Sequence, residues 1–297
     1  MDVLGYTACS QHPAGGRRVG VVLDASGADA LAMQAVAADV GCAETAFLGP
    51  VGDDEFVARY FSPATELSSA AHATIAAAVA HAERRGPGTV RLYTHAGRID
   101  VTTSRAGGHG LTTVLTGAPT RLAKLSDDDL AVLLDALGLH PDDLDLGLPP
   151  RASFAGTWHP VLVARDRSRL DRPVGDVAAL RQLVTARGWT TVDLVWRASR
   201  TAYHCRNPLL TSGIVDDRAS GGAATALVGY LRALSLVRPP TAVSVLQGDE
   251  QGRTSQLSLH VPARSGRGIA IVGHASERPE SALRRLDDGE VLVLAGR

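Results

Sequence analysis

The sequence predicts an α+β fold made of two similar halves. Two segments about 150 positions apart share one order of features: a strand, an arginine shortly before a proline, an acidic loop, and the start of an alanine-rich helix. The first segment, Ala58–His72, leads into a helix at Ala73–Ala82. The second, Cys205–Gly222, leads into a helix at Ala223–Leu234. Such repetition is typical of a duplicated structural unit.

The elements around the first segment follow from local signals. Ser26 is the expected N-cap of a helix over about Ala28–Val40, which Gly41 ends, and a strand follows at Cys42–Leu48. Alternating apolar residues after the alanine-rich helix predict further strands at Val90–Tyr93, Arg98–Thr103 and Leu111–Thr116.

The second half repeats this order. Asp176 begins a helix that runs through Arg187 and ends at Gly188, and the next strand is expected at Thr190–Trp196. The strands expected after its alanine-rich helix are Ala242–Leu246, Gln256–Val261, Ile269–Val272 and Val291–Leu294. Each half therefore reads β-α-β-β-α-β-β. The alternative is two unrelated domains whose element order matches by chance.

The boundary between the halves is expected near residue 122. Ser126 and the three aspartates after it predict a helix that continues to Leu137, and the Pro- and Asp-rich stretch His140–Pro150 reads as a linker. The predicted domains are residues 1–122 and residues 123–297, the latter including a linking region at 123–155.

Composition excludes several classes of protein. Of 297 residues, 45% are hydrophobic and 21% charged, with a net charge of −1, which gives no basic footprint for nucleic acid or acidic membranes. The cysteines Cys9, Cys42 and Cys205 have no metal-ligand spacing, and the chain has no nucleotide-binding loop. We expect a cytoplasmic protein with no membrane span and no cofactor.

The two alanine-rich helices supply candidate anion sites, because a helix N-terminus has free backbone N–H groups and a positive dipole end. Glu44 lies among small and apolar residues at the mouth of a strand, where lost hydration would favour proton transfer. The alternative, which spacing alone favours, is that Glu44 faces solvent. Counted from Gly188, its counterpart in the second half is Thr191, so the acid occurs once.

Further candidates lie at the two helix starts. His72 could hydrogen-bond a substrate or move a proton, although a histidine there is often a plain surface residue. Asp216 and Asp217 precede Ser220-Gly221-Gly222, where paired glycines allow a carboxylate to approach the backbone. The alternatives are that the aspartates only cap the helix and that the glycines form a flexible turn.

Taken together, these segments resemble the PhzF-like phenazine-biosynthesis family, relatives of diaminopimelate epimerase. The motifs are Gly41-Cys42-Ala43-Glu44-Thr45-Ala46-Phe47, Arg59-Tyr60-Phe61-Ser62-Pro63-x-x-Glu66-Leu67, Ala71-His72-x-Thr74-Ile75, Gly213-Ile214-x-Asp216-Asp217-x-x-Ser220-Gly221-Gly222-Ala223, and Gly248-Asp249-Glu250-Gln251-Gly252-Arg253-x-Ser255-x-Leu257. They span nearly the whole chain in the family's order.

The resemblance implies two pseudo-symmetric halves, each a curved mixed sheet around a central helix, with the active site in the cleft between them. It also implies a cofactor-independent homodimer. By the family pattern Glu44 moves the proton, while His72 and Asp217 hold the substrate or assist. Ala71, Ser220, Gly221 and Gly222 occupy its substrate-binding positions.

Several positions depart from the family pattern, which has Ser at Ala43, Gly at Ala71 and Ser at Gly222. The expected function is therefore an isomerase that shifts a proton and a double bond in a different small unsaturated amino acid or carboxylate. Phenazine precursors and 4-substituted dehydroprolines, both from specialised metabolism such as antibiotic biosynthesis, are candidate substrates. The alternatives are an amino-acid racemase or epimerase and a non-catalytic small-molecule binder. A two-cysteine racemase is disfavoured, because no cysteine pair falls at the site positions.

Overall fold

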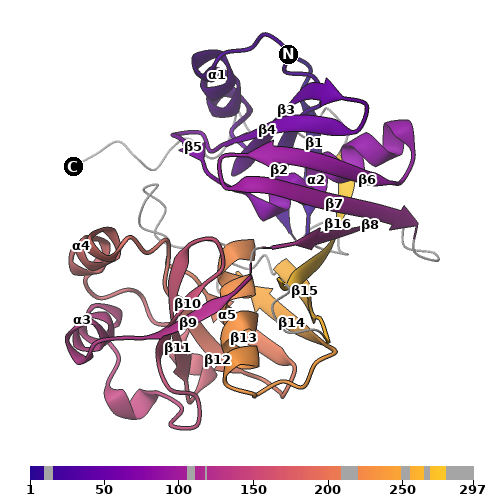
Figure 1. Ribbon diagram of the computed structural model, residues 1–297. Helices are drawn as coiled ribbons and strands as arrows, with labels where there is room; N and C mark the ends of the chain where they lie inside the picture. The colour runs from indigo at the N-terminus through magenta and orange to yellow at the C-terminus, as the bar shows by residue number, and fades with distance from the viewer. Residues whose placement is uncertain are drawn as a thin grey trace. The chain divides into compact units, whose positions relative to one another are not determined.

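A computed structural model describes residues 1–9, 16–105, 111–117, 119–208, 220–248, 255–263 and 268–278 (Figure 1). Its contacts divide the chain into two compact units. Unit 1 consists of Met1–Leu115 and the segment that begins at Gly273, and unit 2 is Thr116–Val272. Unit 1 therefore draws on both ends of the chain, whereas the predicted ranges 1–122 and 123–297 divide the chain at a single point.

Unit 1 is built around one buried helix. Its helices are α1 (Ala30–Val40) and α2 (Ala71–Arg85), and its strands are β1 (Leu4–Ala8), β2 (Arg17–Val22), β3 (Glu44–Gly52), β4 (Glu55–Phe61), β5 (Glu66–Leu67), β6 (Thr89–Thr94), β7 (Gly97–Arg105), β8 (Leu111–Thr116) and β16 (Ala270–Arg278). The strands pair in the order β1-β2-β3-β4-β6-β7-β8-β16, and β16 pairs again with β1. They form a closed circuit, and α2 packs against β1, β2, β3 and β7.

The sequence of α2 explains its central place. Its first three turns are almost entirely small or apolar, so no face needs water, and a helix that is apolar all round is a buried one. Small side chains also let the surrounding strands approach closely. On the outside of unit 1, Met33 and Ala37 of α1 pack with Phe47 and Phe61, whose rings meet edge to face at 5.5 Å.

Unit 2 also contains a buried helix beside a curved set of strands. Its helices are α3 (Asp127–Leu137), α4 (Val177–Arg187) and α5 (Gly221–Ala233), with short 3-10 helices at Pro141–Asp143 and Arg167–Arg169. Its strands are β9 (Arg121–Lys124), β10 (Arg151–Phe154), β11 (Trp158–Ala164), β12 (Asp193–Arg197), β13 (Ala202–Arg206), β14 (Thr241–Gln247) and β15 (Ser255–Val261). They pair in the order β15-β14-β13-β12-β11-β10-β9, and α5 packs against β9, β10, β11 and β15 (Figure 1).

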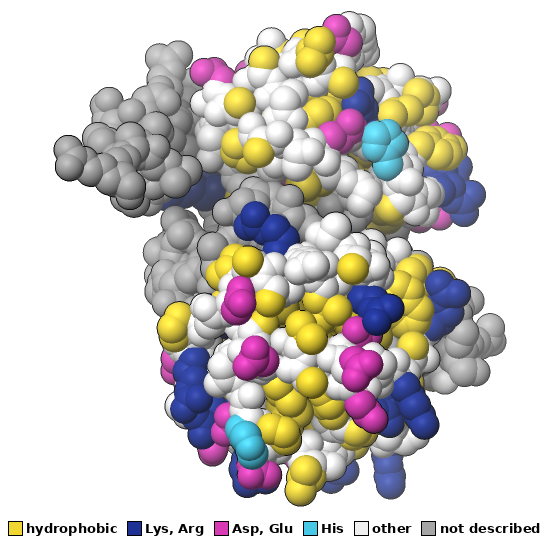
Figure 2. Space-filling model, turned by 90° about the vertical axis from the view of Figure 1, so that its left-hand side faces the viewer, with side chains coloured by type: hydrophobic (Ala, Val, Ile, Leu, Met, Phe, Trp, Pro, Cys, Tyr) yellow, Lys and Arg dark blue, Asp and Glu magenta, His cyan; other side chains and the backbone are white. Residues whose placement is uncertain are grey.

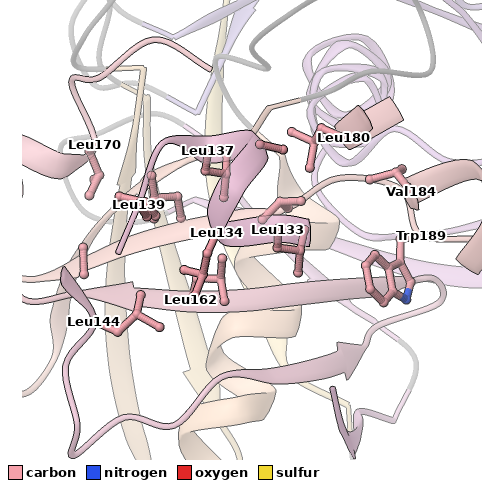
Figure 3. Packing of buried hydrophobic residues seen from close by; sticks show 14 residues of the cluster. Leu133, Leu134, Leu137, Leu139, Leu144, Leu162, Leu170, Leu180, Val184 and Trp189 are labelled. Atoms are coloured by element: carbon pink, nitrogen blue, oxygen red, sulfur yellow. The ribbon is translucent and has the colours of Figure 1, made fainter. Parts of the chain in front are cut away.

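Helices α3 and α4 pack together on the outer face of these strands. Leu133 and Leu137 of α3 and Leu180 and Val184 of α4 belong to the same buried cluster as Leu162 of β11 (Figure 3). Because side chains alternate along a strand, the neighbours of Leu162 in β11 face the opposite way, towards α5. Strand β11 is therefore covered on both faces.

Most local predictions are confirmed. Ser126 caps α3 and Asp176 caps α4, each by accepting a backbone N–H, and Gly41 and Gly188 end their helices in left-handed conformation. The prediction for Ser26 is wrong, because α1 is capped by Asp29, whose carboxylate accepts from Ala32 N at 2.8 Å.

Other limits differ by a few residues. Helix α2 extends beyond the predicted Ala73–Ala82 at both ends, and β3 begins at Glu44 rather than Cys42. The predicted strand Val291–Leu294 lies outside the described residues.

The lengths of the helices and the charges on the surface bear on the expected class of protein. Among the described residues, no helix is long and apolar enough to cross a membrane. On the face drawn in Figure 2, acidic and basic side chains are interspersed, in keeping with the net charge of −1.

Candidate functional site

The predicted residue Glu44 is buried at the N-terminus of α2. It is the first residue of β3 and is only 6% exposed, so the alternative that it faces solvent is wrong. Its Oε2 accepts a hydrogen bond from the backbone N–H of Ala73, at 3.3 Å. Ala70, the N-cap of α2, has no side chain able to accept a hydrogen bond. Glu44 thus supplies from β3 a helix-capping oxygen that the local sequence lacks.

Arg17 is the second charged group at this site. Its Nε lies 3.1 Å from Oε1 of Glu44, and both side chains are at least nine-tenths buried. The pair forms because β2 runs parallel to β3, with Val19 opposite Glu44. The guanidinium and the helix N–H both favour the ionised carboxylate, which is the form that can accept a proton.

His72 is the second residue of α2 and is 1% exposed, so the alternative of a surface histidine is also wrong. Burial, with a smaller contribution from the positive charge of Arg17, lowers the pKa of His72 from 6.5 to about 3. The imidazole is therefore neutral near pH 7. Its Nε2 is buried and has no hydrogen-bond partner among the described residues. A buried polar atom without a partner is costly and points to a bound group that completes it.

Tyr60 and Thr74 brace the same turn of α2. The Thr74 hydroxyl oxygen lies 2.8 Å from both the Ala70 carbonyl oxygen and the Tyr60 hydroxyl. Burial, followed by the negative charge of Glu44, raises the pKa of Tyr60 to about 12. Tyr60 is therefore a neutral hydrogen-bonding group that fixes the start of the helix.

Three predicted residues of the second half, Ser220, Gly221 and Gly222, lie at the start of α5. Ser220 is its N-cap, with Oγ accepting from Ala223 N at 3.2 Å, and Gly221 and Gly222 form the first turn. A Cβ built on Gly222 would lie 3.5 Å from Nε2 of His159, which belongs to β11. His159 is 1% exposed, and burial lowers its pKa to about 4. Asp216 and Asp217 lie outside the described residues.

The repeated arginines have structural partners. Arg59 forms two hydrogen bonds of 2.7 Å with the carboxylate of Glu66, so the acid of the first loop is neutralised locally. Arg206 donates to the backbone carbonyl oxygens of Leu170 and Arg172. Both arginines of the arginine-before-proline pattern therefore anchor neighbouring segments of their own units.

Strand register corrects one equivalence. Val19 lies opposite Glu44 in the parallel pair β2–β3, and Val161 lies opposite Asp193 in the parallel pair β11–β12. The antiparallel pairs β3–β4 and β12–β13 give the same equivalence. If their registers are continued by one residue, Glu44 lies opposite Ser62 and Asp193 lies opposite Asn207, and both Ser62 and Asn207 directly precede a proline. The counterpart of Glu44 is thus Asp193, not Thr191. Counting from Gly188 failed because the second half has two extra residues before the strand.

Sequence reasoning also missed Arg17 and His159. Arg17 meets Glu44 only through the pairing of β2 with β3, and His159 lies in a strand that local signals did not predict. Among the described residues, no cluster of three or more His, Cys, Asp or Glu could hold a metal ion.

A buried carboxylate and a neutral imidazole thus lie at the start of the same helix, α2, and both are groups that can take part in proton transfer. The chain belongs to the PhzC-PhzF family of phenazine biosynthesis-like proteins, whose model matches residues 6–278.

Known proteins similar to this chain include several named isomerases. An uncharacterized isomerase of Deinococcus radiodurans is 29% identical over 265 residues, which cover 87% of this chain and 86% of that protein. The trans-2,3-dihydro-3-hydroxyanthranilate isomerase of Pseudomonas chlororaphis is 26% identical over 266 residues, 87% of this chain and 89% of that protein. A solved structure described as a predicted epimerase from Pseudomonas aeruginosa is 26% identical, with a TM-score of 0.81 over 93% of this chain and 96% of that one.

Proposed function

We propose that this protein is a cofactor-independent isomerase that moves a proton, and with it a double bond, within a small unsaturated carboxylate or amino acid. The observation that carries the proposal is the buried carboxylate of Glu44, which Arg17 and the first turn of α2 hold in place. In this role Glu44 removes a proton from a carbon next to the conjugated system and returns it to another carbon of the same system.

His72 is proposed to bind the substrate beside Glu44. Because its imidazole is neutral and its Nε2 is buried, it can exchange a hydrogen bond with the substrate without adding a charge. Asp217 is proposed as a further substrate partner on the strength of the family motif alone. The free backbone N–H groups at the start of α5, with Gly221 and Gly222, are proposed to receive the substrate carboxylate.

Both units are proposed to serve one substrate, as two copies of a duplicated half. The matching registers of β2–β3 and β11–β12, and the central helices α2 and α5, support the duplication. The relative of Pseudomonas chlororaphis suggests one substrate to test, trans-2,3-dihydro-3-hydroxyanthranilate. Departures at Ala43, Ala71 and Gly222 favour a related but different substrate, and a homodimer is the proposed assembly.

Solvent deuterium incorporation tests the reaction type. The protein is incubated in D₂O with trans-2,3-dihydro-3-hydroxyanthranilate, 4-substituted dehydroprolines and the free amino acids, and the products are followed by ¹H NMR. An isomerase yields a shifted double bond with a proton or deuteron at the new position. A racemase yields inverted product labelled at the α-carbon, and a non-catalytic binder leaves every compound unlabelled; either result contradicts the proposal.

A further inference from the structure

A chain of buried polar side chains links Asp193 to the start of α5. Asn207 Nδ2 donates to Oδ1 of Asp193, and Gln247 Nε2 donates to Oδ1 of Asn207 at 2.7 Å. Gln247 Oε1 then accepts from the backbone N–H of Ser220 at 2.9 Å. Asp193 and Asn207 are fully buried, and Gln247 is 1% exposed. We call these three side chains the Asp193 relay.

Asp193 sets the orientation of the two amide side chains in the relay. An amide side chain can turn either its oxygen or its nitrogen towards a neighbour, so Asn207 and Gln247 each have two orientations. The Asp193 oxygen on Asn207 accepts a hydrogen bond and so holds the Asn207 nitrogen towards it. The Asn207 oxygen then faces Gln247, and the Gln247 oxygen is left to face the N–H of Ser220.

The far end of the relay holds the residue from which α5 starts. Gln247 contacts both backbone groups of Ser220, because its Nε2 also donates to the Ser220 carbonyl oxygen at 3.3 Å. That carbonyl accepts the first helical hydrogen bond, from Ala224 N at 2.9 Å. The orientation of the free N–H groups in the first turn therefore depends on Gln247.

The strand register makes Asp193 the positional counterpart of Glu44. Glu44 reaches the first turn of α2 directly, through Ala73 N. An aspartate side chain is one methylene shorter, and in unit 2 the gap to α5 is spanned by two amide side chains. The same strand position thus fixes the start of the central helix in both units, by a direct contact in one and a relayed contact in the other.

Burying the carboxyl group of Asp193 costs stability. Its Oδ2 is buried and has no hydrogen-bond partner among the described residues, and burial raises the pKa of Asp193 to about 7. A buried carboxyl group with one of its two oxygens unpaired costs stability that an apolar side chain would not. That cost points to a role other than stability.

We propose that Asp193 is a positioning residue that acts through Asn207 and Gln247 to hold the first turn of α5 in the conformation that binds the substrate's carboxylate. This inference rests on the proposed function of the α5 start, and it assigns to Asp193 no contact with the substrate.

Two substitutions separate the hydrogen bond from the packing. Asp193→Asn keeps an oxygen that can accept from Asn207, whereas Asp193→Leu has a similar shape and no acceptor. The matched control is Asp129→Leu. Asp129 is a buried aspartate of unit 2 whose partner is Arg187, at 3.0 Å, on the α3–α4 side. All three variants remove a buried carboxylate, but only Asp193→Leu breaks the relay.

The first measurement is amide hydrogen exchange at Ser220, followed by NMR on the full-length protein. We expect Asp193→Leu to raise the exchange rate of Ser220 by tenfold or more, about the loss of one hydrogen bond. Asp193→Asn and Asp129→Leu are expected to keep the wild-type rate. Unchanged exchange at Ser220 in Asp193→Leu would overturn the relay, whether or not the protein is an isomerase.

The second measurement is carboxylate binding, with benzoate as the probe and the amide resonances of Gly221 and Gly222 as the signal. We expect Asp193→Leu to raise the Kd at least about tenfold, Asp193→Asn to restore it, and Asp129→Leu to lower Tm without changing Kd. Once a substrate is in hand, KM should follow the same order with kcat little changed. Benzoate that leaves Gly221 and Gly222 unshifted in the wild type overturns this inference, while the proton-shift reaction is judged separately by deuterium incorporation.

Discussion

The Nε atom of Arg17 lies 3.1 Å from Oε1 of Glu44, and the other carboxylate oxygen of Glu44 accepts the N–H of Ala73. One carboxylate is thereby held between a guanidinium and a helix N-terminus, both positive. This arrangement favours an ionised base inside the protein, where burial by itself would favour the neutral acid.

Replacing Glu44 with Gln tests its role as the base. Glu44→Gln keeps the shape and an oxygen for Ala73 N but cannot take a proton, so turnover should fall roughly 10²–10⁴-fold while KM changes little. Glu66→Gln is the control, because it breaks another Arg–Glu ion pair of the same unit, a more exposed one with Arg59. Retention of more than about a tenth of wild-type turnover in Glu44→Gln would move the catalytic role elsewhere.

Arg17→Gln removes the positive charge that faces Glu44. Protonation of the buried carboxyl group then becomes easier, and a base must be ionised to act. We expect the acid limb of the kcat/KM profile to move to higher pH, with a smaller move for Arg17→Lys. A profile whose limbs stay in place, measured from pH 4 to 9, would mean that Arg17 does not tune the base.

His72 should make stability depend on pH. Its pKa falls from 6.5 when exposed to about 3 in the folded protein, so between these values the unfolded state binds more protons. The free energy of unfolding should therefore drop as pH falls from about 6.5 towards 3. His72→Gln should weaken this dependence. Denaturant titrations of both proteins at pH 7, 5 and 4 check the prediction, and parallel pH curves would contradict it.

Gly222→Ala tests carboxylate binding at the first turn of α5 without disturbing folding. The added Cβ would meet His159 Nε2 at 3.5 Å, an ordinary contact, and alanine is the better helix former, so Tm should hold or rise. If a carboxylate binds against this turn, the methyl group should still raise KM. Gly229→Ala is the contrast, because its Cβ would lie 2.5 Å from the Cβ of Thr120 and should lower Tm. An unchanged KM in Gly222→Ala would place the carboxylate elsewhere.

The cysteines should be dispensable. Cys9, Cys42 and Cys205 are all buried. Burial raises the pKa of Cys9, and it raises that of Cys42 to about 11, so neither is a thiolate near pH 7. We expect the triple Cys→Ala variant to keep its turnover and iodoacetamide to leave the wild type active. Loss of turnover in the triple variant without loss of folding would revive a thiol-based racemase mechanism.

The sequence by itself determined what depends on neighbouring residues. Helices α3 and α4 were placed correctly because their caps, Ser126 and Asp176, lie within three residues of the N–H groups they satisfy. The alanine-rich composition located α2 and α5 as helices, and the family resemblance implied that each is the central helix of its half. The motifs taken together, those around Glu44 and His72 among them, indicated the family.

Tertiary structure alone decided what depends on pairing between strands. Arg17 meets Glu44 because two parallel strands bring together residues 27 positions apart, which no local pattern records. The equivalence of Glu44 and Asp193 is a matter of register, and counting along the chain missed it by two residues. Strand pairing is fixed by the packing of whole faces around a central helix, so its consequences for single side chains appear only once that packing exists.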